Sequence, residues 1–104
     1  MGRIPRMTYS TSMVLQALAS GHRYGFEIID AVGVRSGTVY PLLRRLEEAR
    51  LVRSRWEAVA VARSSNRPPR KYYELTSAAE PMLALARQRF PAPHLSRDAE
   101  RSRV

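Results

Sequence analysis

The sequence predicts a mainly α-helical α+β domain, and three observations support that class. Apolar residues recur with the spacing of an α-helix in several segments between residues 10 and 90. Between residues 51 and 75 the spacing changes to the alternation typical of two short strands. With 104 residues, 44% of them hydrophobic, the chain is long enough for one domain with a modest core and too short for two.

The chain is strongly basic. Eighteen lysines and arginines against nine acidic residues give a formal net charge of +9. A charge of this sign and density favours polyanionic partners, nucleic acid first and anionic membrane surfaces second. The sequence has no cysteine for a disulfide or thiolate site, and no apolar run of the roughly 20 residues that a membrane helix needs. We therefore expect a cytoplasmic protein with no membrane contact, metal or other cofactor.

Two short helices are predicted in the first third of the chain. Residues 1–8 form a basic arm, which is either a loose leader or a contact for phosphates. The first helix is expected from Ser10 to Ala19 and the second from about Tyr24 to Val32. A glycine, Gly33, ends the second helix and lets the chain turn through positive φ. The buried side of the second helix is expected to consist of Phe26, Ile28, Ile29 and Val32.

A third helix, predicted from Val39 to Ala49, is the most informative segment. Its apolar residues fall at i, i+3, i+4 and i+7 and make one stripe: Val39, Leu42, Leu43 and Leu46. Thr38 is favoured over Ser36 as the N-cap, because Pro41 then falls in the first turn, where its missing N–H costs little. Two short helices joined by a tight glycine-containing turn are the pattern of a helix-turn-helix.

The polar face of this third helix is suited to a DNA major groove. It carries hydroxyl, aromatic and guanidinium groups that can reach bases and phosphates, namely Thr38, Tyr40, Arg44 and Arg45. The alternative is an ordinary solvated helix face. Tyr40 itself has two possible roles, since its ring either stacks on the sugar–phosphate backbone or folds under the helix.

Residues 51–56 and 71–75 are expected to pair as a β-hairpin, with Val59 and Val61 extending its first strand. Behind a helix-turn-helix, such a hairpin is the wing that grips the DNA backbone beside the groove; the alternative is a mobile loop that happens to be basic. The expected phosphate or minor-groove contacts of the wing are Arg63, Arg67, Arg70 and Lys71. Trp56 either anchors the structure or lines an effector pocket at a dimer interface.

A last helix is expected from residue 77 to residue 90. Ser77 and Glu80 are spaced as a capping box, and Pro81 is expected to distort the first turn. The helix carries more apolar surface than a monomer of this size readily buries, which predicts a homodimer contact; packing back on the domain is the alternative. The residues predicted at the dimer interface are Met82, Leu83, Leu85, Ala86 and Phe90.

Three sequence blocks together resemble the PadR-like family of bacterial transcriptional regulators. They are YGFEII at 24–29, SGTVYPLLRRLEEARLV at 36–52 and PRKYYELT at 69–76, and the resemblance extends over about residues 9–90. The resemblance implies a winged helix with a short C-terminal element that makes a homodimer. It also implies that a small hydrophobic or aromatic effector is a candidate regulator, which the sequence does not identify.

The resemblance also implies which residues lie at DNA. It places Ser36, Thr38, Tyr40 and Arg44 there, and Arg35 and Arg45 are candidates from their position alone. Tyr24 is either a phosphate donor or a core aromatic. The chain differs from the family pattern at Ala79, where glycine is common, and in its short loop before the third helix.

We therefore predict a winged helix-turn-helix, α+β and mainly α, with a two-stranded wing and a C-terminal dimerisation helix. The expected boundaries are 1–8 for the arm, 9–76 for the winged-helix domain, 77–90 for the dimerisation helix and 91–104 for a flexible tail. The predicted function is repression by a homodimer on a pseudo-palindromic operator in double-stranded DNA. The alternative is a winged-helix adaptor for another protein. An enzyme is not expected, because the sequence has no nucleophile–base pair, phosphate loop or carboxylate pair.

Overall fold

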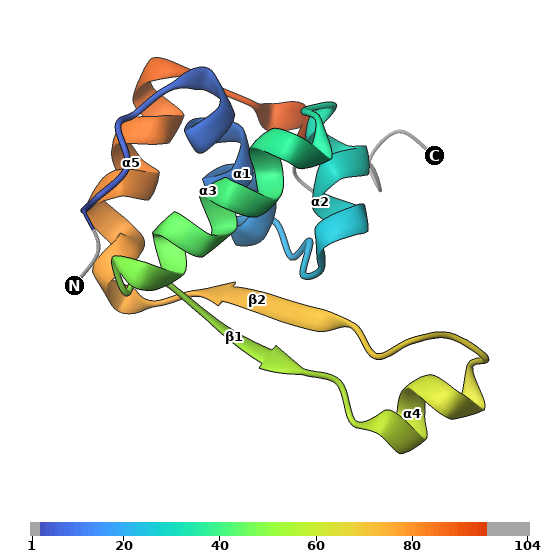
Figure 1. Ribbon diagram of the computed structural model, residues 1–104. Helices are drawn as coiled ribbons and strands as arrows, with labels where there is room; N and C mark the ends of the chain where they lie inside the picture. The colour runs from blue at the N-terminus through green and yellow to red at the C-terminus, as the bar shows by residue number, and fades with distance from the viewer. Residues whose placement is uncertain (1–2, 96–104) are drawn as a thin grey trace.

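The computed structural model describes residues 3–95 and confirms the mainly helical α+β class. Helices α1, α2, α3 and α5 form the body, and a hairpin carrying α4 projects from one side (Figure 1). The elements, in order, are α1 (Tyr9–Ala19), α2 (Gly25–Val32), α3 (Ser36–Glu48), β1 (Val52–Trp56), α4 (Val59–Ser64), β2 (Lys71–Leu75), the 3-10 turn η1 (Ser77–Ala79), α5 (Glu80–Arg89) and the 3-10 turn η2 (Pro93–Leu95).

The core of the body is built around α1. Residues 11–18 of this helix are all buried, because α2, α3 and α5 pack around it. Helix α3 contributes the stripe predicted from its spacing, Val39, Leu42, Leu43 and Leu46. The opposite face of α3 is thereby turned away from the core and towards solvent.

Helix α3 begins earlier than predicted. Arg35 is its N-cap, no side chain caps it, and the amides of Thr38 and Val39 both donate to the Arg35 carbonyl, at 2.9 and 3.0 Å. Pro41 consequently lies inside the helix. The expectation of a Thr38 cap was wrong because one missing intrahelical hydrogen bond costs less than the burial of the helix's apolar stripe gains.

Helix α2 is followed by the expected glycine turn, but its buried side is smaller than predicted. Gly33 has a φ of 67°, the left-handed conformation expected of a glycine at this place. Ile28 is fully buried and Val32 is 9% exposed, whereas Phe26 is 76% exposed. The prediction for Phe26 was wrong, because the chain covers the first turn of α2 on the side of Gly25, which is buried, and leaves the side of Phe26 at the surface.

The wing is a two-stranded antiparallel sheet with a helix inserted between its strands. Strand β1 pairs with β2 from Val52↔Leu75 to Trp56↔Lys71. The expected extension of the first strand through Val59 and Val61 was wrong, because these residues open α4. The linker between α1 and α2 joins the other edge of β2, through a bridge between Tyr24 and Tyr72.

Helix α5 packs against α1 instead of standing apart. Leu83 and Ala86 are buried within the protomer, and Met82 and Phe90 pack against the same core. Leu83 and Ala86 thus pack back on the domain, the alternative to a dimer contact, and the dimer contact of α5 stays a prediction. Leu85, by contrast, is half-buried and lies outside the core cluster.

Buried polar side chains of α1 join it to the end of α5. The Gln16 amide nitrogen donates to the carbonyls of Phe90 (2.8 Å) and Ala86 (3.4 Å), and the Ser12 hydroxyl donates to the carbonyl of Ala86 (3.2 Å). The Ala86 carbonyl also accepts from the Phe90 amide at 2.9 Å, whereas the carbonyl of Phe90, at the C-cap of α5, accepts from Gln16. The pairing fixes α5 on the body through hydrogen bonds as well as apolar contact.

The two ends of α5 also differ from the prediction. No capping box forms, because Ser77 to Ala79 make a 3-10 turn and α5 starts at Glu80 without a side-chain cap. After α5, Ala92 and Leu95 are buried in the core cluster. The packed body thus extends to residue 95, beyond the expected start of a flexible tail, and residues 96–104 lie outside the described residues.

Candidate nucleic-acid interface

The polar face of α3 is a continuous exposed surface. All the side chains predicted there from sequence are exposed, namely Arg35, Ser36, Thr38, Tyr40, Arg44 and Arg45. The one ion pair found for them among the described residues joins Arg44 to Glu48, four residues on, at 3.7 Å. Since both side chains of that pair are more than half exposed, it holds the guanidinium of Arg44 only weakly. Arginine groups on this face are therefore available to an external partner.

A groove runs along one side of the α3 face. It has a volume of about 560 Å³ and separates the N-terminal arm from the first turns of α3. Its lining includes Arg6 and Thr8 from the arm side and Thr38, Pro41 and Arg45 from α3. The described part of the basic arm thus lies beside the helix, where its charge adds to the α3 face.

An aromatic cavity lies on the other side of α3, against the base of the wing. It has a volume of about 350 Å³, and its lining includes Tyr24, Phe26, Tyr40, Trp56 and Tyr73. Trp56 is 66% exposed, so it is not a buried structural anchor. Sequence periodicity missed this cavity, because it brings together side chains from four separate elements, α2, α3, β1 and β2.

Tyr40 occupies its place in the cavity because α2 begins with a glycine. A Cβ added to Gly25 would overlap the ring and hydroxyl of Tyr40, whereas one added to Gly37 would meet nothing within 4 Å. Tyr40 is still 42% exposed. The ring therefore lies over the start of α2 with one side towards solvent. This position is intermediate between the two roles considered from sequence, a ring stacked on the sugar–phosphate backbone and a ring folded under the helix.

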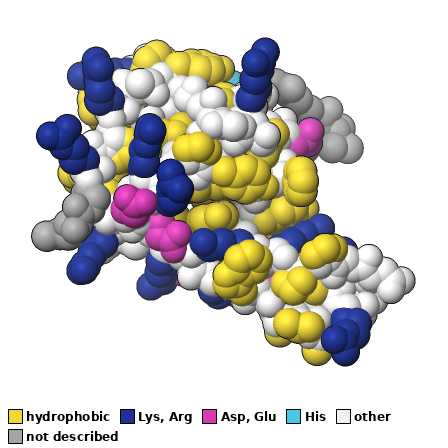
Figure 2. Space-filling model, viewed as in Figure 1, with side chains coloured by type: hydrophobic (Ala, Val, Ile, Leu, Met, Phe, Trp, Pro, Cys, Tyr) yellow, Lys and Arg dark blue, Asp and Glu magenta, His cyan; other side chains and the backbone are white. Residues whose placement is uncertain are grey.

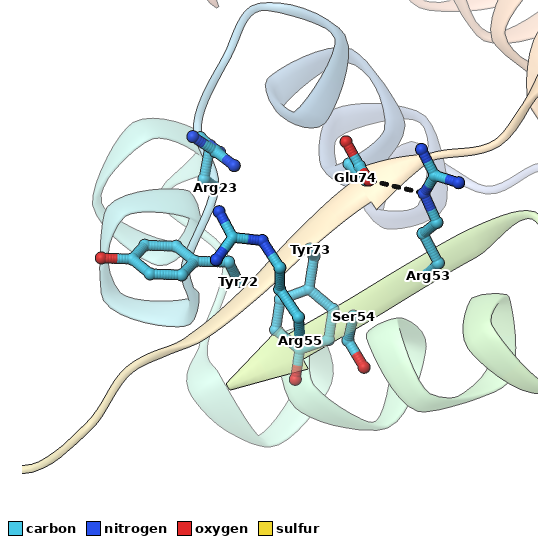
Figure 3. A pocket seen from close by; sticks show the side chains of 7 residues that line it. All are labelled: Arg23, Arg53, Ser54, Arg55, Tyr72, Tyr73 and Glu74. Carbon is cyan, nitrogen blue, oxygen red and sulfur yellow. Dashed lines mark hydrogen bonds and ion pairs between the residues drawn. The ribbon is translucent and has the colours of Figure 1, made fainter. Parts of the chain in front are cut away.

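Tyr72 joins the wing to the body. The guanidinium carbons of Arg23 and Arg55 lie 5.4 and 5.3 Å from the centre of its ring (Figure 3). The ring of Tyr24 meets it edge-on at 6.1 Å. The side chains of Arg23, Arg55 and Tyr72 line a small pocket of about 130 Å³ on the hairpin. The ion pair of Arg53 with Glu74 lies in the same lining. Cations stacked on aromatic rings are attracted by the ring quadrupole, which stabilises this junction.

Glu57 is the centre of a buried ion network at the start of the wing tip. It is 8% exposed and receives two hydrogen bonds from the Arg67 guanidinium, one from the Tyr72 hydroxyl (2.9 Å) and one from the Arg70 amide (3.3 Å). The hydrogen bonds from Arg67, with those from Tyr72 and Arg70, outweigh desolvation and lower the pKa of Glu57 from 4.5 to about 2. The carboxylate is therefore charged at neutral pH and closes the loop that contains α4.

The wing residues predicted to contact DNA differ in whether their charged groups already have a partner within the protein. Arg67 is engaged by Glu57, which competes with a phosphate for its guanidinium, and its role as a phosphate contact stays a prediction. The Arg70 guanidinium lies 4.0 Å from the centre of the Tyr24 ring, and Lys71 pairs with Glu47 at 3.5 Å. Arg63, on α4, is exposed. Sequence reasoning overlooked that Glu57, the single acidic residue between Glu48 and Glu74, needs a partner once it is buried.

Two further findings limit the chemistry of the described residues. No cluster of three or more His, Cys, Asp or Glu side chains that could hold a metal ion occurs among them. Nor does this part of the chain contain a helix long and apolar enough to cross a membrane.

A helix-turn-helix with an exposed basic face on its second helix, followed by a wing, defines the class of winged-helix DNA-binding proteins. The family model described as the transcriptional regulator PadR-like family matches residues 14–84. The chain belongs to this family and is a DNA-binding transcriptional regulator. No curated protein matches it in sequence.

Solved structures support the same assignment. A PadR family transcription regulator from hypervirulent Clostridium difficile is 29% identical, with a TM-score of 0.66 over 78% of this chain and 85% of that one. A PadR-like transcriptional regulator from Bacillus cereus is 28% identical, with a TM-score of 0.58 over 75% and 77% of the two chains. A Streptococcus transcriptional regulator is 26% identical, with a TM-score of 0.61 over 90% and 91%.

Proposed function

We propose that the chain is a cytoplasmic protein that represses transcription as a homodimer bound to a pseudo-palindromic operator in double-stranded DNA. The observation that supports this most directly is the division of α3 into a fully buried apolar stripe and an exposed face of hydroxyl and guanidinium groups. Two such helices, related by a two-fold axis, would enter successive major grooves about 34 Å apart. A dimer bound over a promoter would block access to it.

The side chains of α3 divide into two proposed roles. Thr38, Tyr40 and Arg44 read base edges. Tyr40 and Arg44 lie one turn apart on one side of the exposed face, and Thr38 lies on its other side, beside the N-terminal arm. Arg35 and Arg45, with Arg63 of the wing, contact phosphates and set the affinity.

Selection of bound sequences from a random duplex pool tests this proposal. We expect an enriched inverted repeat whose half-sites are one helical turn apart. On that sequence Arg44→Ala should weaken binding about 10- to 100-fold, the loss expected for a guanidinium that reads a base, and more than it weakens binding to random DNA.

Arg87→Ala is the matched control, since it removes the same charge from the exposed surface of α5. This variant should weaken binding to the selected sequence and to random DNA slightly and by the same factor. A pool without any enriched sequence would instead indicate an adaptor with non-specific affinity, and would overturn the operator proposal.

The homodimer is proposed to form through the remaining apolar surface of α5. Leu85 is half-buried and outside the core, next to the half-buried Met82 and Phe90. Leu85→Lys should convert a dimer to a monomer in sedimentation velocity, while Ala84→Lys, at an exposed neighbour, should not. If the Leu85 variant remains a dimer, the dimer interface does not include Leu85, and the proposed interface is wrong.

The aromatic cavity between α3 and the wing is the proposed seat of a small aromatic effector. A ligand there would occupy the space beside Tyr40 and would compete with DNA for that ring. Trp56, the only tryptophan, lines the cavity, so its fluorescence reports binding directly. Titration with benzoate and salicylate should quench the fluorescence of Trp56 and release DNA at the same ligand concentrations. Quenching without release of DNA would show that a ligand in the cavity does not regulate DNA binding.

A further inference from the structure

The face of the hairpin that is turned away from α3 carries arginines to which the DNA complex gives no role. Side chains alternate between the two faces of a strand. The Ser54 hydroxyl of β1 donates to Glu47 of α3, so the face that includes Ser54 is directed towards that helix. Arg53 and Arg55, on either side of Ser54, therefore project from the opposite face, as does Tyr72, which pairs with Arg55. We call this opposite face the outer face of the hairpin.

A pocket of about 130 Å³ lies on the outer face, and Arg23 from the linker between α1 and α2 completes it. The guanidinium groups of Arg23 and Arg55 are directed towards each other beside the ring of Tyr72 (Figure 3). The pocket thus joins two parts of the molecule that are distant in sequence, the linker of the helical body and the first strand of the wing.

Two of the three arginines in this pocket lack a carboxylate partner. Arg53 is bonded to Glu74 at 2.5 Å. Among the residues that the structure describes, no ion pair holds Arg23 or Arg55, and both side chains are exposed. Two like charges beside one ring repel each other, and the attraction of the ring offsets this only in part. The pocket therefore presents two positive charges that an anion would neutralise.

The charge and the size of the pocket indicate a phosphate group as its ligand. Two guanidinium groups balance a dianion, and a phosphate monoester carries close to two negative charges at neutral pH. Guanidinium groups also match phosphate oxygens with paired N–H donors. The volume of about 130 Å³ is well below the roughly 300 Å³ at which pockets enclose drug-sized molecules, so the phosphate would enter and the rest of a larger molecule would remain outside.

A phosphate group could come from the DNA backbone or from a small molecule, and the position of the pocket favours the small molecule. A duplex placed along the exposed face of α3 meets the hairpin from the α3 side or at its tip, whereas the pocket opens on the outer face. Figure 2 shows hydrophobic side chains gathered at the end of the wing that carries α4, and Lys and Arg side chains nearer the strands. The cations of the pocket thus lie away from the tip of the wing.

We propose that this pocket binds the phosphate group of a small phosphorylated molecule, held between Arg23 and Arg55. Because one arginine belongs to the body and the other to the wing, the bound phosphate fixes the hairpin on the body. The inference goes beyond the proposed repression, since it requires neither an operator nor a ligand in the aromatic cavity, and the site lies apart from the polar face of α3.

Thermal unfolding with inorganic phosphate as the probe, at constant ionic strength and neutral pH, tests the proposal. The Tm of the wild type should rise by about 5 °C at about 10 mM phosphate, for a dissociation constant near ~1 mM. The same concentration of acetate, a monoanion, should raise it much less. Arg55→Ala should lose at least half of the rise, whereas the matched control Arg87→Ala, on the exposed side of α5, should keep it. Phosphate also stabilises proteins through its exclusion from their surface, so the difference between the two variants is the test.

Amide chemical shifts of the wild type locate the phosphate independently of the stability of any variant. On titration with phosphate they should change mainly at residues 23, 53–55 and 72–74, the lining of the pocket. An equal rise of Tm in the two variants, or shift changes confined to other residues, would overturn the proposal.

Titration in the presence of a DNA duplex distinguishes the two sources of phosphate. If the ligand is a small molecule, the shift changes at Arg23 and Arg55 persist in the DNA complex, and Arg55→Ala leaves the salt slope of DNA binding unchanged. If the duplex abolishes them and Arg55→Ala lowers the salt slope by about 1, the pocket binds the DNA backbone and the proposal is overturned. A random duplex pool without an enriched sequence would overturn the operator proposal and leave this one intact.

Discussion

Helix α3 and the wing are both rich in arginine, but they use it in different ways. On α3, Arg44 has only an exposed partner at 3.7 Å, and Arg35 and Arg45 have no ion-pair partner among the described residues. In the wing, Arg67 is one quarter exposed and binds Glu57 through both of its terminal nitrogens. The first arrangement leaves charge for an external ligand, whereas the second consumes it inside the protein.

From this comparison we expect a basic residue in a DNA-binding element to be less available to DNA where a buried internal partner competes for it. A buried carboxylate is such a competitor, because leaving it unpaired costs more than a phosphate contact on the surface returns. In the wing, Arg67 therefore supports the loop that contains α4, through Glu57 and the carbonyl of Ala62. The outer surface of α4 is apolar where the surface of α3 is charged.

The largest expected effect is a difference in stability between variants on the buried and the exposed face of α3. Leu43→Ala should lower the free energy of unfolding by about 2–5 kcal/mol, because Leu43 is fully buried and its truncation leaves a cavity. Arg44→Ala, at the next residue, should change it by less than about 0.5 kcal/mol. Urea denaturation of both variants measures the difference. Equal destabilisation would show that the face carrying Arg44 is also part of the packed structure.

Next in size is the contrast between two arginines of the wing. Arg67→Ala should lower Tm and speed amide exchange in residues 57–70, because it leaves the buried Glu57 carboxylate without its main partner. Arg63→Ala should leave Tm unchanged and reduce the salt slope of DNA binding by about 1, as expected for one lost phosphate contact. The opposite assignment of these two phenotypes would contradict the internal role of Arg67.

The ion network should also make stability depend on pH. The pKa of Glu57 is about 2 in the folded protein against 4.5 for the unperturbed group. Its contribution to stability is therefore complete above about pH 4.5 and is lost as the pH falls towards 2. The Tm of Glu57→Gln should fall less steeply over this range than that of the wild type. Glu48→Gln, which changes an exposed carboxylate, should keep the wild-type slope, and parallel curves for all three proteins would refute the shift.

The smallest expected effect concerns the border between α3 and the wing. Gly25→Ala should displace the ring of Tyr40 without unfolding the protein, because the ring is the far end of a flexible side chain. The emission of Trp56 should shift and operator binding should weaken several-fold. Gly37→Ala, whose added Cβ meets no neighbour, should leave Trp56 emission unchanged. An identical spectrum in both variants would place Tyr40 away from the cavity.

Spacing along the chain was sufficient to predict most of the helical body. The stripe of Val39, Leu42, Leu43 and Leu46 is buried as expected, and the exposed face of α3 follows from it. The hairpin strands 52–56 and 71–75 lie within or close to the predicted segments. The three sequence blocks predicted the family, which the family model matching residues 14–84 then confirmed.

The sequence by itself determined the helices of the body, the two paired strands and which side of α3 faces the core, because these depend on neighbours within one or two turns. It did not determine α4, which stands where an extended strand was expected. Only the tertiary structure decided the partner of each side chain. Arg67 meets Glu57 across a ten-residue loop, α5 buries Leu83 and Ala86 against α1, and Phe26 and Trp56 remain exposed. These outcomes depend on which distant segments close on each other, and no local pattern of residues contains that information.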